Sequence, residues 1–186
     1  NFGDDGANNV GLLSYDHGGN YMRMKTNADV GTVVRLNSAG TLSTGNETAA
    51  DANAGGITLD QNAGDGPILT FKSSDVAHGM TDHLETDTYA ELKKNDGATG
   101  GARWRGFSEN ETSMFFQCFA TNDNTTQSSS AGANFIIDSR KKSGTDAGAH
   151  GANANLFCIQ NTASTRFIVD EDGDILYDGG ASAYDE

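Results

Sequence analysis

The sequence has few large apolar residues and no long hydrophobic run. Leu, Ile, Val and Phe account for only 32 of 186 residues, about 17%, and the net charge is −14. That combination is more typical of disordered chains than of folded ones. No stretch approaches the ~18 to 20 apolar residues that span a bilayer, so no transmembrane helix is expected. The composition predicts that one copy of the chain cannot build a thick hydrophobic core by itself.

Basic residues and proline are also scarce. Twelve Lys and Arg face 26 Asp and Glu, whereas binding to nucleic acid or to anionic lipid needs clustered basic side chains. We therefore expect neither nucleic-acid binding nor membrane insertion. The single proline and the lack of a Gly-x-y period exclude a collagen-like chain. The first residue is Asn, and the first residues lack the basic start and apolar stretch of a secretory signal peptide. We therefore expect a processed product or a piece of a longer protein.

The two cysteines define no disulfide framework. Cys118 and Cys158 each lie in an apolar run, where cysteine usually behaves as a small buried hydrophobe. A disulfide between them is the alternative. A metal site would need more ligands than two isolated thiols supply.

The apolar residues that are present gather in ten short runs separated by Gly, Asn, Asp and Ser. The runs are 21–24, 33–36, 57–59, 68–71, 102–107, 114–119, 135–137, 156–159, 167–169 and 175–177. Several alternate with a period of two, as Met22 and Met24 do, which predicts half-buried strands. The runs 114–119 and 156–159 are nearly continuous, as in strands covered on both faces. The sequence therefore predicts an all-β protein.

Signals for helix are confined to one place. Thr88 and Glu91 have the spacing of a capping box, with Leu84 and Leu92 nearby. The turn-forming residues 95–97 would end such a helix within two turns, and the same residues are at home in a strand. We expect one short helix there at most.

Two segments of the sequence resemble each other. In both 34–42 and 167–175 an apolar strand is followed by Asn or Asp, two further residues, Gly and a second strand. Gly40 and Gly173 supply the positive φ that such a turn needs, and Asn37 and Asp170 can cap it. Each segment is therefore predicted to be a hairpin.

Polar stretches suggest where the chain divides. Residues 41–56 hold a single large apolar residue and are predicted to be a linker or a long surface loop, and 123–132 and 143–155 are also predicted loops. The predicted organisation is an N-terminal β-hairpin segment with its linker over 1–54, followed by a β-rich, fibre-like domain over 55–186.

Two clusters of acidic residues and histidines were considered as metal sites. Residues 170–174 resemble the start of a calcium loop, but Gly falls at position 4 and position 12 is Ala181, so a hairpin turn is the simpler interpretation. His78 and His83 form the densest group of potential ligands, together with Asp75, Asp82 and Glu85. Their spacing requires a turn to bring them together, and a polar loop is the preferred interpretation.

No residue is assigned a catalytic, cofactor-binding or metal-binding role, and no cofactor is expected. The sequence contains no nucleophile elbow, P-loop or dinucleotide fingerprint. The only tryptophan, Trp104, could stack on a sugar ring. A strand with Trp104 packed inward and Arg103 and Arg105 pointing outward is preferred. The sequons at Asn46, Asn110 and Asn124 are no more numerous than chance predicts.

Residues 55–186 resemble a group of virion structural or tail-fibre-like proteins of tailed phages, many from marine and metagenomic sources. The resemblance is carried, in this order, by Gly56-Ile57-Thr58-Leu59-Asp60-Gln61, the segment 68–80, Glu85-Thr86-Asp87-Thr88-Tyr89, Lys142-Ser143-Gly144-Thr145, Asn153-Ala154-Asn155-Leu156-Phe157 and the segment 166–175. Proteins of this group commonly continue beyond the region matching 183–186, which implies a fragment or cleaved form. The resemblance implies a structural or adhesive part of a virus particle and no catalytic residues.

These expectations combine into one hypothesis. The chain is expected to be a non-enzymatic virion structural protein, a fibre or surface appendage on the extracellular particle. It is expected to be elongated, with short strands and hairpins in a homotrimeric β-prism or β-solenoid-like arrangement, a β-sandwich being the alternative. Expected partners are other copies of the chain, other virion proteins and a host receptor or glycan that contacts loops such as 123–132. The alternative functions are a glycan-degrading fibre domain and a bacterial surface or filament protein.

Overall fold

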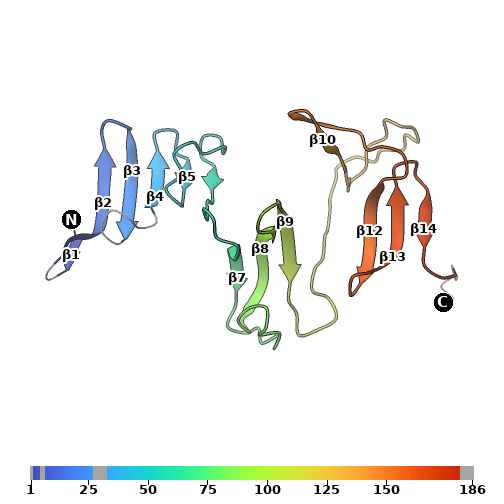
Figure 1. Cartoon of the computed structure of the whole chain (residues 1–186), viewed down its shortest axis with the longest axis horizontal. Coiled ribbons are helices and arrows are strands. Elements are labelled where there is room, and N and C mark those ends of the chain that lie inside the picture. The colour runs from blue at the N-terminus through green and yellow to red at the C-terminus, as the bar shows by residue number, and fades with distance from the viewer. Residues whose placement is uncertain (1, 5–6, 27–32, 181–186) are drawn as a thin grey trace. The chain divides into compact units, whose positions relative to one another are not determined.

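The computed structural model describes residues 2–4, 7–26 and 33–180, and within them the chain forms strands and no helix. The predicted all-β class is confirmed. The chain divides into two compact units, residues 1–116 and 117–186. Figure 1 shows the strands of each unit in chain order.

A six-stranded sheet begins the first unit. Its strands are β1 (Phe2–Asp4), β2 (Ala7–Asp16), β3 (Tyr21–Thr26), β4 (Val33–Asn37), β5 (Leu42–Ser43) and β6 (Ile57–Thr58). They lie side by side in sequence order, all antiparallel except for the parallel pair β5–β6. The register sets Met22 between Tyr15 and Leu36 and sets Arg23 between Ser14 and Arg35. Neighbours along β3 therefore point to opposite faces, as the alternating pattern predicts.

The polar segment 41–56 was predicted to be a linker or a long surface loop; residues 42–43 form β5 of this sheet, and 44–56 contain no strand. Thr41 and Ser43 are buried, and β5 is paired with both β4 and β6. The hydroxyl of Thr44 donates to the Asp60 carbonyl at 3.1 Å and accepts the Asp60 N–H at 3.0 Å. The boundary predicted after residue 54 lies inside the first unit.

The rest of the first unit is an antiparallel sheet of β7 (Pro67–Lys72), β8 (Thr88–Asp96) and β9 (Gly100–Gly106). The short helix predicted at Thr88–Glu91 is wrong, because these residues begin β8. Its alternating residues are shared between two faces, with Glu91 opposite Arg105 and Leu92 opposite Trp104. Pairing on both sides of β8 outweighs the local capping signal.

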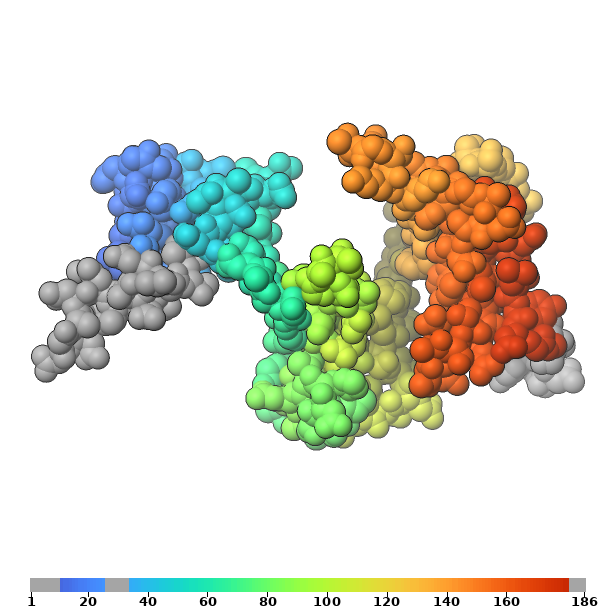
Figure 2. Space-filling model, viewed as in Figure 1, coloured from blue at the N-terminus to red at the C-terminus, as the bar shows by residue number. Residues whose placement is uncertain are grey.

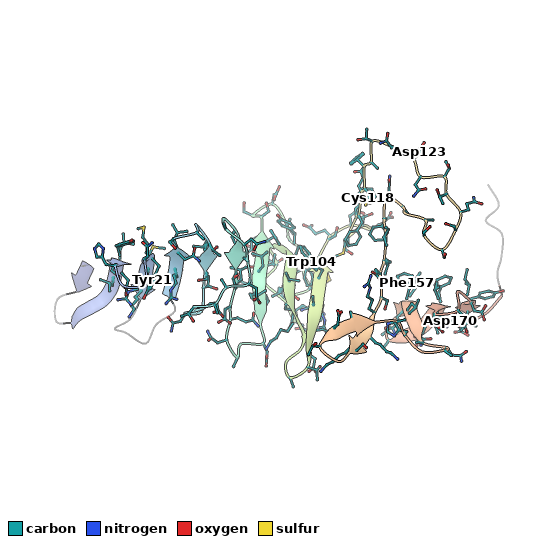
Figure 3. All side chains as sticks on the ribbon, turned by 90° about the horizontal axis from the view of Figure 1, so that it is seen from above. Tyr21, Trp104, Cys118, Asp123, Phe157 and Asp170 are labelled. Atoms are coloured by element: carbon teal, nitrogen blue, oxygen red, sulfur yellow. The ribbon has the colours of Figure 1, made fainter. Side chains whose placement is uncertain are left out.

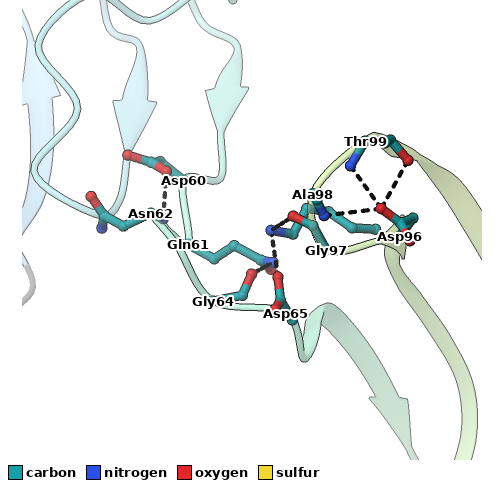
Figure 4. Close-up of polar contacts among 10 residues, drawn as sticks. Asp60, Gln61, Asn62, Gly64, Asp65, Asp96, Gly97, Ala98 and Thr99 are labelled. Carbon is teal, nitrogen blue, oxygen red and sulfur yellow. Dashed lines mark hydrogen bonds and ion pairs between the residues drawn. The ribbon is translucent and has the colours of Figure 1, made fainter.

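The β8–β9 turn also holds the segment that leads into β7 (Figure 4). Lys94 forms an ion pair with Asp65 at 2.7 Å. Asp96 Oδ1 accepts the backbone N–H of Thr99 at 2.7 Å and its hydroxyl at 2.8 Å. These hydrogen bonds, and one from the N–H of Ala98, lower the pKa of Asp96. The turn therefore depends on an ionised carboxylate.

The second unit holds a hairpin and a three-stranded sheet. The hairpin is β10 (Lys141–Ser143) with β11 (Asp146–Gly148), and the antiparallel sheet is β12 (Asn155–Asn161), β13 (Ser164–Asp170) and β14 (Ile175–Tyr177). Part of the predicted loop 143–155 thus belongs to a hairpin. In Figure 2 this hairpin, in orange, projects from the rest of its unit.

Both hairpins predicted from the internal resemblance are confirmed. The carbonyl of Asn37 accepts the N–H of Gly40 at 3.0 Å, and that of Asp170 accepts the N–H of Gly173 at 3.2 Å. In each turn the side-chain Oδ1 also accepts the N–H four residues further on, at 2.9 and 2.8 Å. The two glycines have φ of 78° and 86°, values that favour glycine because it has no Cβ. The two turns share one hydrogen-bonding pattern.

The β2–β3 turn uses an aspartate in a similar way. Asp16 Oδ1 accepts the N–H of Gly19 at 2.9 Å, and Oδ2 accepts the hydroxyl of Tyr21 at 3.1 Å. The hydrogen bond from Gly19 and then that from Tyr21 lower the pKa of Asp16. This turn, like the β8–β9 turn, is stabilised by the ionised side chain.

Two of the ten predicted strands are wrong. Residues 114–119 and 135–137 form no strand, and their side chains are exposed, Phe119 by 86%. A strand needs another strand along its length to pair with its backbone groups, and none of the described strands is paired with these segments. The run 156–159 does lie in a strand, β12, but it is not covered on both faces, since Phe157 and Ile159 are exposed.

The burial predicted for the cysteines is also wrong. Cys118 and Cys158 are free and exposed. Cys118 lies in the segment 114–119, which forms no strand, and Cys158 lies on the sheet β12–β14, which the described chain leaves open. Figure 3 labels Cys118 and Phe157 in these two places.

The hydrophobic core of the described chain is very small. Phe107, which is 6% exposed, is the single large apolar side chain that it buries, whereas more than twenty others are exposed. The prediction that one copy cannot build a thick core agrees with this burial.

Candidate functional site

The most enclosed group of polar side chains lies on one face of the β7–β9 sheet. Glu91 on β8 is completely buried, and Arg105 on β9 is its cross-strand partner and forms an ion pair with it. The Arg105 guanidinium also lies over the ring of Phe107, 5.5 Å from its centroid. A buried carboxylate is stable only with such a partner, because its desolvation costs several kcal/mol.

Two histidines complete this cluster. The ring of His78 stacks on Phe107 with centroids 5.0 Å apart, and its Nδ1 accepts the N–H of Met80 at 2.9 Å. His83 Nδ1 lies 3.4 Å from Arg105 Nη1. A guanidinium can only donate, so this His83 nitrogen acts as an acceptor. The cluster thus holds the loop between β7 and β8 against β9.

The cluster leaves two buried atoms without a hydrogen-bond partner, Glu91 Oε2 and His78 Nε2. Such atoms are where a water molecule or an ion is normally bound. The described residues, however, bring no three His, Cys, Asp or Glu side chains together at a possible metal position. The contacts of the cluster hold the loop between β7 and β8.

The carboxylates predicted beside the two histidines are directed elsewhere. Glu85 is ion-paired with Lys72, and Asp75 accepts a hydrogen bond from the hydroxyl of Ser73, which lowers the pKa of Asp75. Asp82 is exposed in the loop. The structure brings His78 and His83 to the same phenylalanine but does not bring these carboxylates to them.

Sequence reasoning missed the most buried carboxylate, Glu91. Its place in an apparent capping box favoured a helix, in which a glutamate of the first turn would be exposed. Ala90 and Leu92, on either side of it, show the period of two that marks a strand face. That alternation was the available signal.

The predicted orientation of Trp104 is reversed. Arg105 points to the buried cluster, while Trp104 lies on the opposite face and is 56% exposed. Its ring is stacked near Phe71, with centroids 6.4 Å apart and an interplanar angle of 19°. Figure 3 labels Trp104 on its strand. The uncovered face of this sheet is therefore the aromatic one.

The acidic segment 170–174 serves the hairpin turn described above. Asp170 is buried, and its Oδ1 is occupied by a backbone N–H. Asp123, by contrast, belongs to an open loop that lines a hollow of about 640 Å³ together with Asn122, Asn124 and Asn134. The predicted loop 123–132 contains no strand and is exposed.

One face of the six-stranded sheet in the first unit is uncovered, and we call it the Met22 face. The register places the apolar side chains of β2 to β6 on the same side. Its members are Leu13, Tyr15, Met22, Met24, Val34, Leu36, Leu42 and Ile57. Most of these side chains are exposed, and six of them line a groove of about 180 Å³ that Arg23 also borders.

The sheet β12–β14 has a similar surface in the second unit. Phe157, Val169 and Ile175 are in register on one face, and Cys158, Ile168 and Leu176 are in register on the other. A sheet with apolar side chains on both faces is typical of a structure in which both are covered.

No helix among the described residues is long and apolar enough to cross a membrane. Comparison with known proteins found no match to the chain among protein-family models, curated proteins or solved structures.

Proposed function

We propose that the chain is a structural subunit of a virus particle, a fibre or surface appendage that forms by self-association and has no enzymatic activity. The observation that carries the proposal is the burial pattern. A chain that folds into paired strands but buries a single large apolar side chain among its described residues needs other copies to complete its core. The assignment to a virion rests on the resemblance of residues 55–186 to tail-fibre-like phage proteins.

The exposed surface agrees with association. The chain exposes 14257 Å², whereas a compact monomer of 19.5 kDa is expected to expose about 8,500 Å². The excess, about 5,700 Å², is larger than domain interfaces within one chain, which bury about 600 to 1,500 Å². Obligate subunit interfaces, at about 2,000 to 5,000 Å² or more, are of the right size.

The proposed assembly is a homotrimer in which the short sheets of the three copies cover one another, as in a β-prism or a β-solenoid-like stack. Radial or axial repetition leaves few exposed edges and suits short strands joined by tight turns. A sandwich of two sheets is the alternative. The acidic surface keeps neighbouring assemblies apart, and the exposed loop 123–132 is the proposed contact with a host receptor or glycan.

The mass of the native particle in solution tests this proposal. Light scattering or native mass spectrometry is expected to give three times the 19.5 kDa of one chain, unchanged on dilution through the micromolar range. A compact, stable monomer at micromolar concentration would overturn the proposal. Mass growing without limit at higher concentration would favour a filament over a closed trimer.

One observation favours a second candidate, a glycan-degrading fibre domain. Trp104 and Phe71 present nearly parallel aromatic rings on an exposed sheet face, a surface on which a sugar ring can lie. Hydrolysis would also need two carboxylates about 5 to 10 Å apart beside this platform. Incubation with host polysaccharide tests this candidate, and the absence of new reducing ends would eliminate it.

A further inference from the structure

We infer that the Met22 face is the surface through which copies of the chain pack together, each copy presenting this face to the same face of a neighbour. This inference rests on the proposed function, because it names the contact that the proposed assembly uses. Three independent features of the six-stranded sheet support it.

The first feature is the separation of the two faces by register. Leu13, Met24 and Val34 are cross-strand partners on the Met22 face. The opposite face carries Arg23 and Arg35, which lie opposite each other on neighbouring strands. Arg23 donates to the Ser14 hydroxyl at 3.0 Å. The polar face therefore has a side-chain hydrogen bond across its strands, whereas most apolar side chains of the Met22 face remain exposed.

The second feature is the area. Leu13, Tyr15, Met22, Met24 and Leu36 are each between 41% and 51% exposed, and Ile57 is 62% exposed. With about 200 Å² for a large apolar side chain, these six expose roughly 590 Å² per copy. A standard interface buries about 800 Å² per partner. The exposed apolar side chains of the Met22 face therefore supply most of the area that such an interface needs, without the contribution of backbone atoms and surrounding residues.

The third feature is the charge. The chain carries −14 overall, but residues 11–43 hold three basic residues and two acidic ones. No acidic residue occupies a position of the Met22 face. Two strongly acidic copies repel each other at most surfaces, and this region is where they can approach without opposing carboxylates. The two methionines also adapt easily to a neighbouring surface.

A charge placed on this face tests the inference. In the variant Met24→Lys each copy would bring a lysine against an apolar surface and close to the lysine of its neighbour. Like charges placed together at an interface cost enough to weaken association at least about 30-fold. The matched control is Ser38→Lys, which adds the same charge at an exposed turn position. Met24→Leu keeps the surface apolar and is expected to assemble as the unchanged chain does.

The readout is the dissociation constant of the oligomer from light scattering over a dilution series, with far-UV circular dichroism to establish that each variant is folded. If Met24→Lys fails to fold, Met24→Ala replaces it. That variant removes about half a methionine's burial and is expected to weaken association about tenfold, whereas Ser38→Ala has no effect.

The outcomes separate the two proposals. An unchanged chain that forms oligomers, with Met24→Lys and Ser38→Lys associating equally well, overturns the Met22 face and leaves the structural role standing. An unchanged chain that is monomeric overturns both. Loss of association in Met24→Lys alone supports both.

Discussion

Removing the partner of the buried carboxylate should destabilise the chain far more than removing both members of the pair. Glu91 is completely buried and forms an ion pair with Arg105. The variant Arg105→Met would leave a buried charge without compensation, a change that typically costs about 3 to 5 kcal/mol. Because the Arg105 side chain is itself 26% exposed, water can reach part of the site, and we expect about 3 kcal/mol.

The double variant Glu91→Leu, Arg105→Met replaces the pair by apolar side chains of similar size and is expected to lie within about 1 kcal/mol of the unchanged chain. The matched control is Arg103→Met, two residues away on the same strand. Arg103 donates to the exposed Asn95 at 2.8 and 3.0 Å, and water can replace that contact, so we expect a loss below about 1 kcal/mol.

Urea unfolding at a fixed protein concentration measures these differences, because association makes stability depend on concentration. The fluorescence of the single tryptophan, Trp104, reports on the same sheet. If Arg105→Met lowers the free energy of unfolding no more than Arg103→Met does, Glu91 is not a buried carboxylate that depends on Arg105. The inference that this ion pair fixes the loop between β7 and β8 would then be wrong.

Three other predictions concern turns, pH and salt. Asn37→Ala removes the hydrogen bonds that Oδ1 accepts from Ala39 and Thr41, and Asp170→Ala removes the one accepted from Asp174. Each variant should lower the free energy of unfolding in urea by at least about 1 kcal/mol, whereas Ser38→Ala should change it by less than about 0.5 kcal/mol. Losses no larger than that of Ser38→Ala would contradict the role of these side chains in the turns. The pKa values of Asp16 and Asp96 are lowered in the folded chain, so the ionised side chains stabilise the fold. This stabilisation is complete above about pH 4, where both side chains are ionised even in the unfolded chain. It is lost as the pH falls through the pKa values of the folded chain. Thermal unfolding followed by circular dichroism should therefore show a loss below pH 4 that shrinks in Asp96→Asn. Each copy carries a net charge of −14, so the copies repel one another. Raising the ionic strength from 0.01 to 0.15 M shortens the screening length from about 30 to about 8 Å and should lower the dissociation constant of the oligomer measured by light scattering. A dissociation constant that does not change with salt would show that charge repulsion does not limit association.

The parts of the fold that the sequence predicts well are local. The turns at Asn37 and Asp170 follow from a capping side chain and a glycine at fixed spacing, and both turns form with that pattern. Strand faces follow from alternation where one face is polar, as at Met22 and Arg23 on β3. Such patterns depend on neighbours along the chain or across one strand pair.

The parts that the sequence predicts poorly depend on which face of a strand meets which surface. In β9 the pattern Arg103-Trp104-Arg105 shows two faces but not which of them is covered. The preference for burying tryptophan gave the wrong answer, because Arg105 has a buried carboxylate across the strand pair. Similarly, Thr88 and Glu91 have the spacing of a capping box, but both lie in β8, where Glu91 is paired with Arg105 across the strand pair. Long-range pairing decided both cases.

The two apolar segments that form no strand lead to a last prediction. Residues 114–119 and 135–137 have the composition of buried strands, yet the single chain leaves Phe115, Phe119 and Ile136 exposed. If strands of other copies pair with these segments, backbone N–H groups in 114–119 should exchange with deuterium at least about tenfold more slowly in the assembled protein than after dilution to single chains. The loop 123–132, which is polar and exposed, is the internal control and should exchange rapidly in both states. Equally fast exchange of 114–119 in the assembled protein would show that these phenylalanines stay outside the shared core, and the burial argument for self-association would then rest on the sheet faces alone.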